Sequence, residues 1–302
     1  MEDTLFPQNA SKSASEWIKA EEMRYHGAVS RIASRILSQK IRFVFLAGPS
    51  CSGKTTTGHR LVKCLSEGGK RVFTFSTDDF FFNEEVAPRN DDGTPRYDAF
   101  SHTDSAYIIS VLRCFSQGKD TELPSFDFYR GRRCEKTTPV SPADYDVFIL
   151  EGIHALNNVI LEALPPSEKR VCIYLELLRG VRTESGSESL SADEIRFCRR
   201  LIRDYKHRNA SADRTYSLWG NVLRDEKEIL HPFRNNADFT VETGLGYEVA
   251  ALRDQVIGVL QKASPEGPNR QRADDLIRSV SAFPSFPSRW VPQNSVLREF
   301  ID

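Results

Sequence analysis

Short apolar runs alternate with amphipathic segments along most of this chain of 302 residues. The runs are rich in Val, Ile, Leu and Phe and are bounded by polar or glycine-containing turns, which is typical of buried strands. Strands are expected over residues 41–47, 72–76, 146–150, 171–175 and 239–241. Apolar residues at helical spacing predict helices over 14–39, 55–66, 105–116, 192–208, 216–230, 247–262 and 274–280. This alternation predicts an α/β fold with a doubly wound, mainly parallel sheet and flanking helices, whose ligands gather at the carboxyl ends of the strands.

The same pattern divides the chain into three parts. Residues 1–40 form a helical extension ahead of the first strand, and residues 41–263 form one α/β domain. Residues 264–302 form a tail with a short helix and a Pro-rich end, which we expect to pack on the core.

In three segments of the domain, apolar residues follow neither helical nor strand spacing. Residues 80–103 are rich in Asn, Asp, Gly and Pro and predict a long functional loop. Residues 124–133 predict a hairpin or loop. The polar, Ser- and Glu-rich stretch 180–191 predicts a mobile loop.

The first expected strand runs into Gly48-Pro49-Ser50-Cys51-Ser52-Gly53-Lys54-Thr55, a complete G-x-x-x-x-G-K-[ST] phosphate loop. The helix expected from Thr55 supplies the strand–turn–helix context that the motif requires, so the domain is of the P-loop NTPase type. A glycine turn beside a surface lysine is the alternative.

Each residue type in this loop has a chemical reason. Gly48 and Gly53 permit backbone angles and a close approach that a Cβ would forbid. The loop N–H groups would converge on the β-phosphate at the positive end of the helix. Lys54 would neutralise the β- and γ-phosphates, and the Thr55 hydroxyl would bind Mg²⁺. ATP and Mg²⁺ are therefore the expected cofactors, with the nucleotide held by Gly48, Pro49, Ser50, Cys51, Ser52, Gly53, Lys54, Thr55 and Thr56.

The composition and charge of the chain limit the kinds of binding partner and cysteine chemistry that we expect. The 41 basic and 42 acidic residues give a net charge of −1, which favours neither a nucleic acid nor an anionic membrane as a partner. The six cysteines are scattered and form no C-x-x-C pair, which argues against a metal cluster or a disulfide framework. No run is long enough to span a membrane, and the acidic N-terminus lacks a signal segment, so a cytoplasmic location is expected.

Acidic residues follow two of the expected strands. Asp78 and Asp79 follow the strand at 72–76, and Glu151 follows the strand at 146–150. An aspartate at the first position can accept a hydroxyl proton and touch Mg²⁺, and a carboxylate at the second can hold the metal. Polar residues that only satisfy loops at strand ends are the alternative.

A basic cluster lies on the helix expected at 192–208. Its arginines at helical spacing share one face, interrupted only by Asp204: Arg196, Arg199, Arg200 and Arg203. Such a row suits a lid over about 192–215 that closes on phosphates and stabilises developing charge. A solvated face or a nucleic-acid patch is the alternative. No N-K-x-D or L-S-G-G-Q signature is present, which favours a small-molecule kinase over a GTPase or a transporter ATPase.

Five motifs occur in the order and spacing of one enzyme family. They are Gly48–Thr56, Thr77-Asp78-Asp79-Phe80-Phe81, Pro124-Ser125-Phe126-Asp127-Phe128, Leu150-Glu151-Gly152-Ile153 and Arg199-Arg200-Leu201-Ile202-Arg203-Asp204. Together they resemble the uridine kinase/phosphoribulokinase family. The leading helix 14–39 and the tail 292–301 are similar to a microbial uridine kinase-like nucleoside kinase branch, so the resemblance covers nearly the whole chain.

The resemblance implies roles for individual positions. Asp78 matches the general base for the nucleoside 5′-hydroxyl, and Glu151 and Thr55 match the magnesium ligands. Asp98 resembles the acid that binds the ribose hydroxyls. Arg200 resembles a ribose- or phosphate-contacting arginine, and Arg203 and Arg208 resemble arginines that clamp the ATP phosphates. The aromatic residues that fall where the family builds the wall of its base pocket are Phe81, Phe126 and Phe128.

Three departures from the family pattern concern the substrate. Uridine and cytidine kinases have a tyrosine at the position of Phe126 and a histidine at the position of Gly131, so two polar contacts to the base are lost. The lid ends in Arg208-Asn209-Ala210, with one arginine fewer. A site without its polar base readers discriminates bases poorly, so an altered or broad nucleoside specificity is expected.

The sequence thus predicts ATP-dependent transfer of a phosphoryl group to a nucleoside 5′-hydroxyl. Asp78 would act as base and contact the metal, and Lys54 and Arg203 would stabilise the transferred charge. One alternative is a sugar-phosphate kinase that uses Arg130, Arg132 and Arg133 as a phosphate pocket. Another is a nucleotide-binding regulatory protein without phosphotransfer. A homo-oligomer is compatible with the resemblance.

Overall fold

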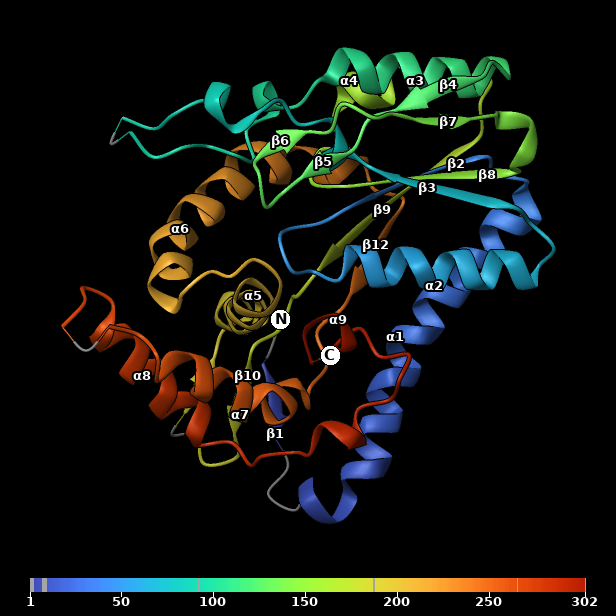
Figure 1. Ribbon diagram of the computed structural model, residues 1–302. Coiled ribbons are helices and arrows are strands. Elements are labelled where there is room, and N and C mark those ends of the chain that lie inside the picture. Colours follow the sequence, from blue (N-terminus) through green and yellow to red (C-terminus); the bar gives the residue numbers. More distant parts are fainter. Residues whose placement is uncertain (1–2, 7–9, 92, 187, 265, 302) are drawn as a thin grey trace.

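A five-stranded parallel sheet lies at the centre of the molecule (Figure 1). The computed structural model describes residues 3–6, 10–91, 93–186, 188–264 and 266–301. The strand order across the sheet is β12 (Phe239–Glu242), β9 (Arg170–Glu176), β2 (Phe43–Ala47), β8 (Val147–Glu151) and β3 (Val72–Ser76). The α/β fold with a mainly parallel sheet is therefore confirmed.

Alternate residues of each central strand enter two different hydrophobic clusters. In β2, Val44 and Leu46 pack in one cluster, whereas Phe43 and Phe45 pack in the other. Because successive side chains of a strand point to opposite faces, both faces of the sheet are buried. All five residues of β2 are buried, which explains why its sequence reads as a continuous apolar run.

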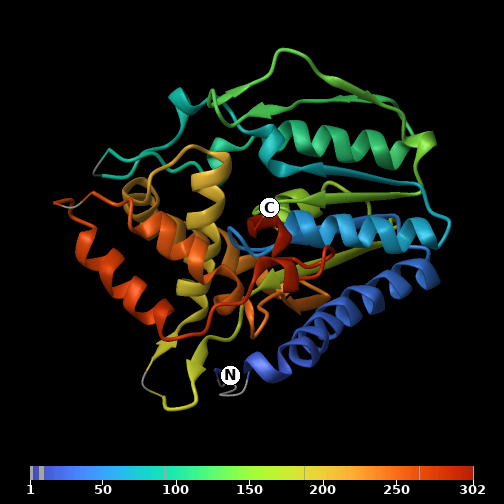
Figure 2. The same ribbon diagram turned by 60° about the horizontal axis from the view of Figure 1, so that its bottom comes forward.

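Helices cover both faces of the sheet. The helices α1 (Ala10–Gln39) and α2 (Lys54–Glu67) pack against each other on one face. The helices α3 (Ser105–Gln117) and α4 (Asn158–Leu161) cover the other face. The remaining helices lie beside the first face: α5 (Ala192–His207), α6 (Ala212–Asp225), α7 (Glu248–Leu260), α8 (Arg270–Ser281) and α9 (Arg298–Ile301). Figure 2 shows that the chain returns at its C-terminus to the beginning of α2. None of the helices within the described ranges is long and apolar enough to cross a bilayer.

The expectation of a mobile loop over residues 180–191 is wrong. The described residues of this stretch form the antiparallel strands β10 (Val181–Thr183) and β11 (Ser189–Leu190), and β10 pairs in parallel with β1 (Thr4–Phe6). These strands are too short and too polar to give an alternating pattern. The strand β1 lies far away along the chain, so local sequence could not reveal the pairing.

The other irregular segments follow the sequence pattern more closely. The described residues of 80–103 form short 3₁₀ turns, the last at Phe100–His102, and two isolated β-bridges, with no longer helix or strand. Residues 124–133 form an antiparallel hairpin of β5 (Phe126–Asp127) and β6 (Arg132–Arg133), and a second pair joins β4 (Thr121–Leu123) to β7 (Thr138–Val140). The helix expected over 216–230 begins earlier, at Ala212, where the Ser211 hydroxyl accepts a hydrogen bond from the Arg214 N–H. It ends at Asp225 and continues as a π-helical turn, Glu226–Leu230.

Candidate functional site

The phosphate loop connects β2 to α2 in a geometry that requires its two glycines. Gly53 has φ of 82°, a left-handed conformation that disfavours side chains. A Cβ on Gly48 would lie 2.5 Å from the Leu175 carbonyl oxygen of the neighbouring strand. Lys54 spans the loop and donates hydrogen bonds from Nζ to the carbonyl oxygens of Gly48 (2.9 Å) and Pro49 (3.1 Å). Its ammonium group is thus held over the loop, where a phosphate would be drawn to it.

Glu151 ends β8 directly opposite the first turn of α2. The Thr55 hydroxyl donates to its carboxylate, at 3.2 Å from Oε1 and 3.4 Å from Oε2. Burial raises the pKa of Glu151 to about 7, although the nearby Lys54 ammonium opposes the shift. The hydroxyl and the carboxylate therefore face each other at the lysine end of the loop.

This pair suits a magnesium ion. Mg²⁺ takes hard oxygen ligands and keeps several waters, so one or two protein groups and the substrate phosphates hold it. Among the described residues, no group of three or more His, Cys, Asp or Glu side chains could hold a metal ion alone. Thr55 and Glu151 would hold Mg²⁺ together with the nucleotide, and the ion would neutralise charge on the phosphates.

The raised pKa of Glu151 predicts a pH-dependent effect on stability. Its pKa in the folded protein lies above the ordinary value of 4.5, so it contributes stability at low pH that is lost as pH rises through about 7. Glu151→Gln mimics the protonated acid. In the absence of nucleotide and metal, this variant should be more stable than the wild type at pH 8 by up to about 3 kcal/mol, and by much less at pH 4. Urea unfolding at the two pH values measures the difference. Glu67→Gln, on the exposed face of α2, is the control and should show no such pH dependence; equal curves for Glu151→Gln and wild type at pH 8 would contradict the prediction.

Asp78 lies where β3 ends in a short 3₁₀ turn, Thr77–Phe80. Its N–H donates to the Ser76 hydroxyl (3.2 Å), and its Oδ1 accepts from the Thr77 hydroxyl (3.3 Å). Burial raises the pKa of Asp78, while Lys54 and Arg208 lower it and Asp98 raises it further. The neighbouring Asp79 has a different environment, because its carboxylate accepts hydrogen bonds from the backbone of Ser76 and Phe126. Of the two, Asp78 is the one whose charge interacts with the phosphate-loop lysine.

The three aromatic residues predicted for a base pocket lie in contact beside this turn. Phe81 stacks on the buried ring of His102, with ring centroids 5.2 Å apart. Phe126 meets Phe81 edge-on at 5.8 Å, and Phe128 meets Phe126 at 5.2 Å. Phe81 is buried, whereas Phe128 is 50% exposed and lies 5.5 Å from the Arg208 guanidinium. The structure thus brings the three rings into one row that leads from the core to the last arginine of the basic cluster.

Three arginines converge on one buried carboxylate. Asp204 accepts from Arg200 Nε (3.1 Å) and Arg203 Nη2 (3.1 Å), and Arg208 Nη1 lies 3.6 Å away. Although burial opposes it, these guanidinium groups lower the pKa of Asp204. Arg200 also donates to the Ser50 hydroxyl of the phosphate loop (3.0 Å). One carboxylate cannot balance three cations, so this cluster retains positive charge beside the loop, as a site for phosphate requires.

The other two arginines of the expected row do not face the site. Arg196 forms an ion pair with Glu226 (2.8 Å), and Arg199 forms one with Glu248 (2.6 Å). The expectation that only Asp204 interrupts the row is therefore wrong, because acidic partners from the π-helical turn after α6 and from α7 neutralise half of it. Both pairs support the loop from behind: Arg199 donates to the Cys51 carbonyl (3.2 Å), and Glu226 accepts from the Ser50 N–H (2.9 Å).

The structure adds a contact that the sequence did not reveal. Arg96, in the loop 80–103, donates to Asp225 at the end of α6 (2.6 and 2.9 Å) and to Glu228 (2.6 Å). Asp98, two residues along, is close enough to raise the pKa of Asp78. Arg96 and its two partners are more than a hundred residues apart along the chain, so the sequence pattern could not reveal their pairing.

Gly131 lies in the turn of the β5–β6 hairpin with φ of 64°. A Cβ at this position would approach the Glu84 carboxyl carbon to 2.4 Å. The left-handed φ disfavours a histidine here, and any side chain would also have to move the exposed carboxyl end of Glu84.

The chain is similar in sequence to known kinases. Residues 43–250 match the Phosphoribulokinase / Uridine kinase family. The chain is 29% identical over 213 residues to a uridine kinase of Lactobacillus helveticus, covering 70% of this chain and 91% of that protein. It is 27% identical over 212 residues to a uridine kinase of Macrococcus caseolyticus, covering 70% and 92%.

Among solved structures, a candidate fructose transport system kinase from Silicibacter sp. TM1040 is similar to this fold, with a TM-score of 0.53 and 18% identity. The match covers 70% of this chain and 98% of that one. At this identity the likeness concerns the fold alone.

Proposed function

We propose that this chain, which belongs to the Phosphoribulokinase / Uridine kinase family, transfers the γ-phosphoryl group of ATP to the 5′-hydroxyl of a nucleoside. The observation that carries the proposal is that Asp78, at the end of β3, is close enough to Lys54 of the phosphate loop for their charges to interact, with Asp98 also close by. A carboxylate of raised pKa beside the lysine of the loop is suited to take a proton from a hydroxyl group.

The transfer would proceed by in-line displacement. The 5′-oxygen forms a bond to the γ-phosphorus as the bond from that phosphorus to the β–γ bridging oxygen breaks, and ADP leaves. The hydroxyl proton passes to Asp78. Lys54 and the cluster of Arg200, Arg203 and Arg208 would stabilise the charge on the phosphates. Asp98 would accept hydrogen bonds from the ribose hydroxyls of the acceptor.

The contacts of the β5–β6 hairpin favour a nucleoside over a phosphorylated acceptor. A sugar phosphate needs its own basic pocket outside the donor site, and three arginines of this hairpin were the candidates. Arg133 pairs with Asp104 (3.1 Å) and donates to the Phe80 carbonyl (2.8 Å), Arg132 pairs with Glu85, and Arg130 lies 3.6 Å from Asp127. All three are therefore paired with acids: Arg132 and Arg133 join the hairpin to residues between 80 and 104, and Arg130 pairs within the hairpin.

The wall of the base pocket would be mostly apolar. Phe126 lacks the hydroxyl of a tyrosine, and Glu84 fills the space beside Gly131. Apolar surfaces discriminate weakly between molecules of similar shape. We therefore expect several nucleosides to be accepted.

A substrate panel with Mg²⁺ and ATP tests the proposal. Uridine, cytidine, adenosine and guanosine should be phosphorylated at the 5′-hydroxyl, with values of kcat/KM that differ by less than about 100-fold. Formation of ADP, followed together with the nucleoside monophosphate, measures turnover. Ribulose 5-phosphate and fructose are the comparison acceptors. Turnover of either one with none of any nucleoside would reject the nucleoside assignment and leave a kinase for another hydroxyl acceptor.

A further inference from the structure

The last residues that the structure describes lie against the phosphate loop. In the C-terminal segment, residues 295–301, Val296, Leu297 and Phe300 are completely buried. A Cβ on Gly53 would lie 2.4 Å from a methyl group of Val296, so this side chain fills the space beside the loop glycine. The Phe300 ring lies 5.3 Å from the guanidinium of Arg199. Figure 2 shows this end of the chain against the start of α2.

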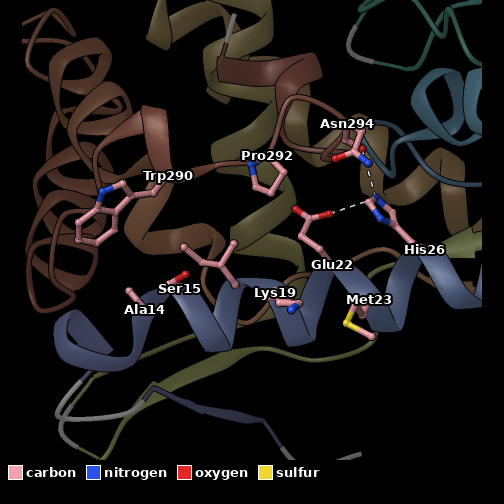
Figure 3. A pocket seen from close by; sticks show the side chains of 10 residues that line it. Ala14, Ser15, Lys19, Glu22, Met23, His26, Trp290, Pro292 and Asn294 are labelled. Carbon is pink, nitrogen blue, oxygen red and sulfur yellow. Dashed lines mark hydrogen bonds and ion pairs between the residues drawn. The ribbon is translucent and has the colours of Figure 1, made fainter.

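Contacts with the long N-terminal helix fix the position of this segment. The Tyr247 hydroxyl lies 2.5 Å from a Glu22 carboxylate oxygen of α1 and 3.4 Å from the Ser295 hydroxyl. In Figure 3, Glu22 and His26 point from α1 toward the tail, and His26 Nε2 lies 3.3 Å from the Asn294 carbonyl oxygen. A hollow of about 660 Å³ between α1 and the tail lies beside these contacts. The segment is therefore anchored to the core of the protein before it reaches the loop.

Glu299 presents a carboxylate to the first turn of α2. The Thr56 hydroxyl donates to it at 2.8 Å, whereas the adjacent Thr55 hydroxyl donates to Glu151. Successive residues of a helix point about 100° apart, so the two threonines look to different sides of the site. Thr55 faces Glu151, at the side of Lys54 and Asp78, and Thr56 faces the C-terminal segment.

This arrangement gives the bound nucleotide a direction. The γ-phosphate must lie toward Asp78 and Glu151, where the acceptor and the metal would be. The triphosphate runs along the loop N–H groups, so the nucleoside half of the donor leaves the loop on the side of Thr56 and Glu299. We propose that the C-terminal segment forms the ribose wall of the donor site and that Glu299 accepts a hydrogen bond from a ribose hydroxyl of ATP. This inference rests on the proposed use of ATP as donor.

The chemistry of the groups supports this role. An ionised carboxylate only accepts hydrogen bonds, and the ribose offers two hydroxyl donors. When the donor binds, the Thr56 hydroxyl can turn to a phosphate oxygen and release Glu299 for the ribose. Arg203 is near enough to Glu299 for their charges to interact, which offsets repulsion between this carboxylate and the phosphates.

Nucleotide binding without any acceptor tests the inference. Calorimetry with ATP and with 2′,3′-dideoxy-ATP should show that the wild type binds ATP at least about tenfold more tightly, as expected for a hydrogen bond to a charged group. Glu299→Ala should bind both nucleotides with the affinity that the wild type has for the dideoxy form. Glu299→Gln, which keeps an acceptor oxygen, should retain part of the difference.

Arg298→Ala is the matched control for loosening of the tail. Its guanidinium binds backbone carbonyls of the tail itself, including that of Pro292 (3.3 Å). This variant should lower the melting temperature and keep the preference for ATP. The inference is overturned if Glu299→Ala binds ATP as the wild type does, if it loses affinity for both nucleotides equally, or if it binds ATP more tightly, as it would if the carboxylate competed with phosphate. A panel in which no nucleoside is phosphorylated would reject the acceptor and leave this comparison unaffected.

Discussion

Asp78→Asn is expected to lower kcat by about 10²–10⁴-fold and to leave ATP binding nearly unchanged. The amide cannot take the proton of the acceptor hydroxyl, but its oxygen can still accept the hydrogen bond from Thr77. The variant should fold normally, since it removes a buried charge that lies near Asp98. Initial rates with a nucleoside, together with calorimetric affinity for ATP, separate the chemical step from binding.

Asp79→Asn is the matched control for this experiment. Asp79 is one residue away and also has a raised pKa, because of burial and of the neighbouring Asp78. Its carboxylate accepts hydrogen bonds from backbone N–H groups, and Lys54 does not contribute to the shift of its pKa. The variant Asp79→Asn should therefore retain most of the nucleoside phosphorylation rate of the wild type. If Asp79→Asn abolishes turnover and Asp78→Asn does not, the roles of the two residues are reversed, and if neither substitution lowers turnover, neither carboxylate is the base. No turnover by the wild type itself, with ATP still bound, would indicate a nucleotide-binding regulator without phosphotransfer.

Arg199→Met is expected to destabilise the protein by about 3–5 kcal/mol, because it leaves the buried Glu248 carboxylate without its cation. Neither side chain of this pair is more than 1% exposed, and the guanidinium also donates to the carbonyls of Thr243 (3.0 Å) and Cys51 (3.2 Å). Urea unfolding of the unliganded protein measures the loss.

A second substitution separates charge from loop support. In Arg199→Met/Glu248→Gln the unpaired charge is gone, and the amide oxygen still accepts from the Leu245 N–H, so most of the stability should return. Arg199→Met should also weaken ATP binding, because the Cys51 carbonyl of the phosphate loop, a residue with φ of 60°, loses its hydrogen-bond donor. The second substitution does not restore this donor, so the affinity for ATP should stay low. Arg278→Met removes a surface pair with Asp275 and should cost less than about 1 kcal/mol. A loss of similar size in Arg199→Met would show that the buried pair contributes little.

The sequence predicted the site best where its residues are close along the chain. Gly48 to Thr56 form one turn with the start of its helix, and the strands that lead to Asp78 and Glu151 are largely apolar segments that end at the same edge of the sheet. Parallel strands bring these groups together by topology, without any knowledge of side-chain contacts. The proposal for Lys54, Thr55 and Glu151 therefore needed only the strand boundaries.

Contacts between residues that are far apart along the chain could not be predicted in this way. The arginines of α5 share one face at helical spacing, but whether each is free depends on Glu226 and Glu248, which come from other elements. The hairpin of β10 and β11 is completed by β1, and the carboxylate that reaches Thr56 lies at residue 299. Local propensity carries no information on these partners, since the contacts form only when distant segments fold together.

The contact from Arg96 to Asp225 and Glu228 has a thermodynamic consequence. It joins the loop that would hold the acceptor to the helix that follows the phosphate-binding arginines, so an acceptor that orders the loop also acts on the position of that helix. Coupling of this kind is reciprocal. If the acceptor raises the affinity for ATP by some factor, ATP must raise the affinity for the acceptor by the same factor. The free energy of the Arg96 ion pairs is the upper limit of the coupling that passes through them.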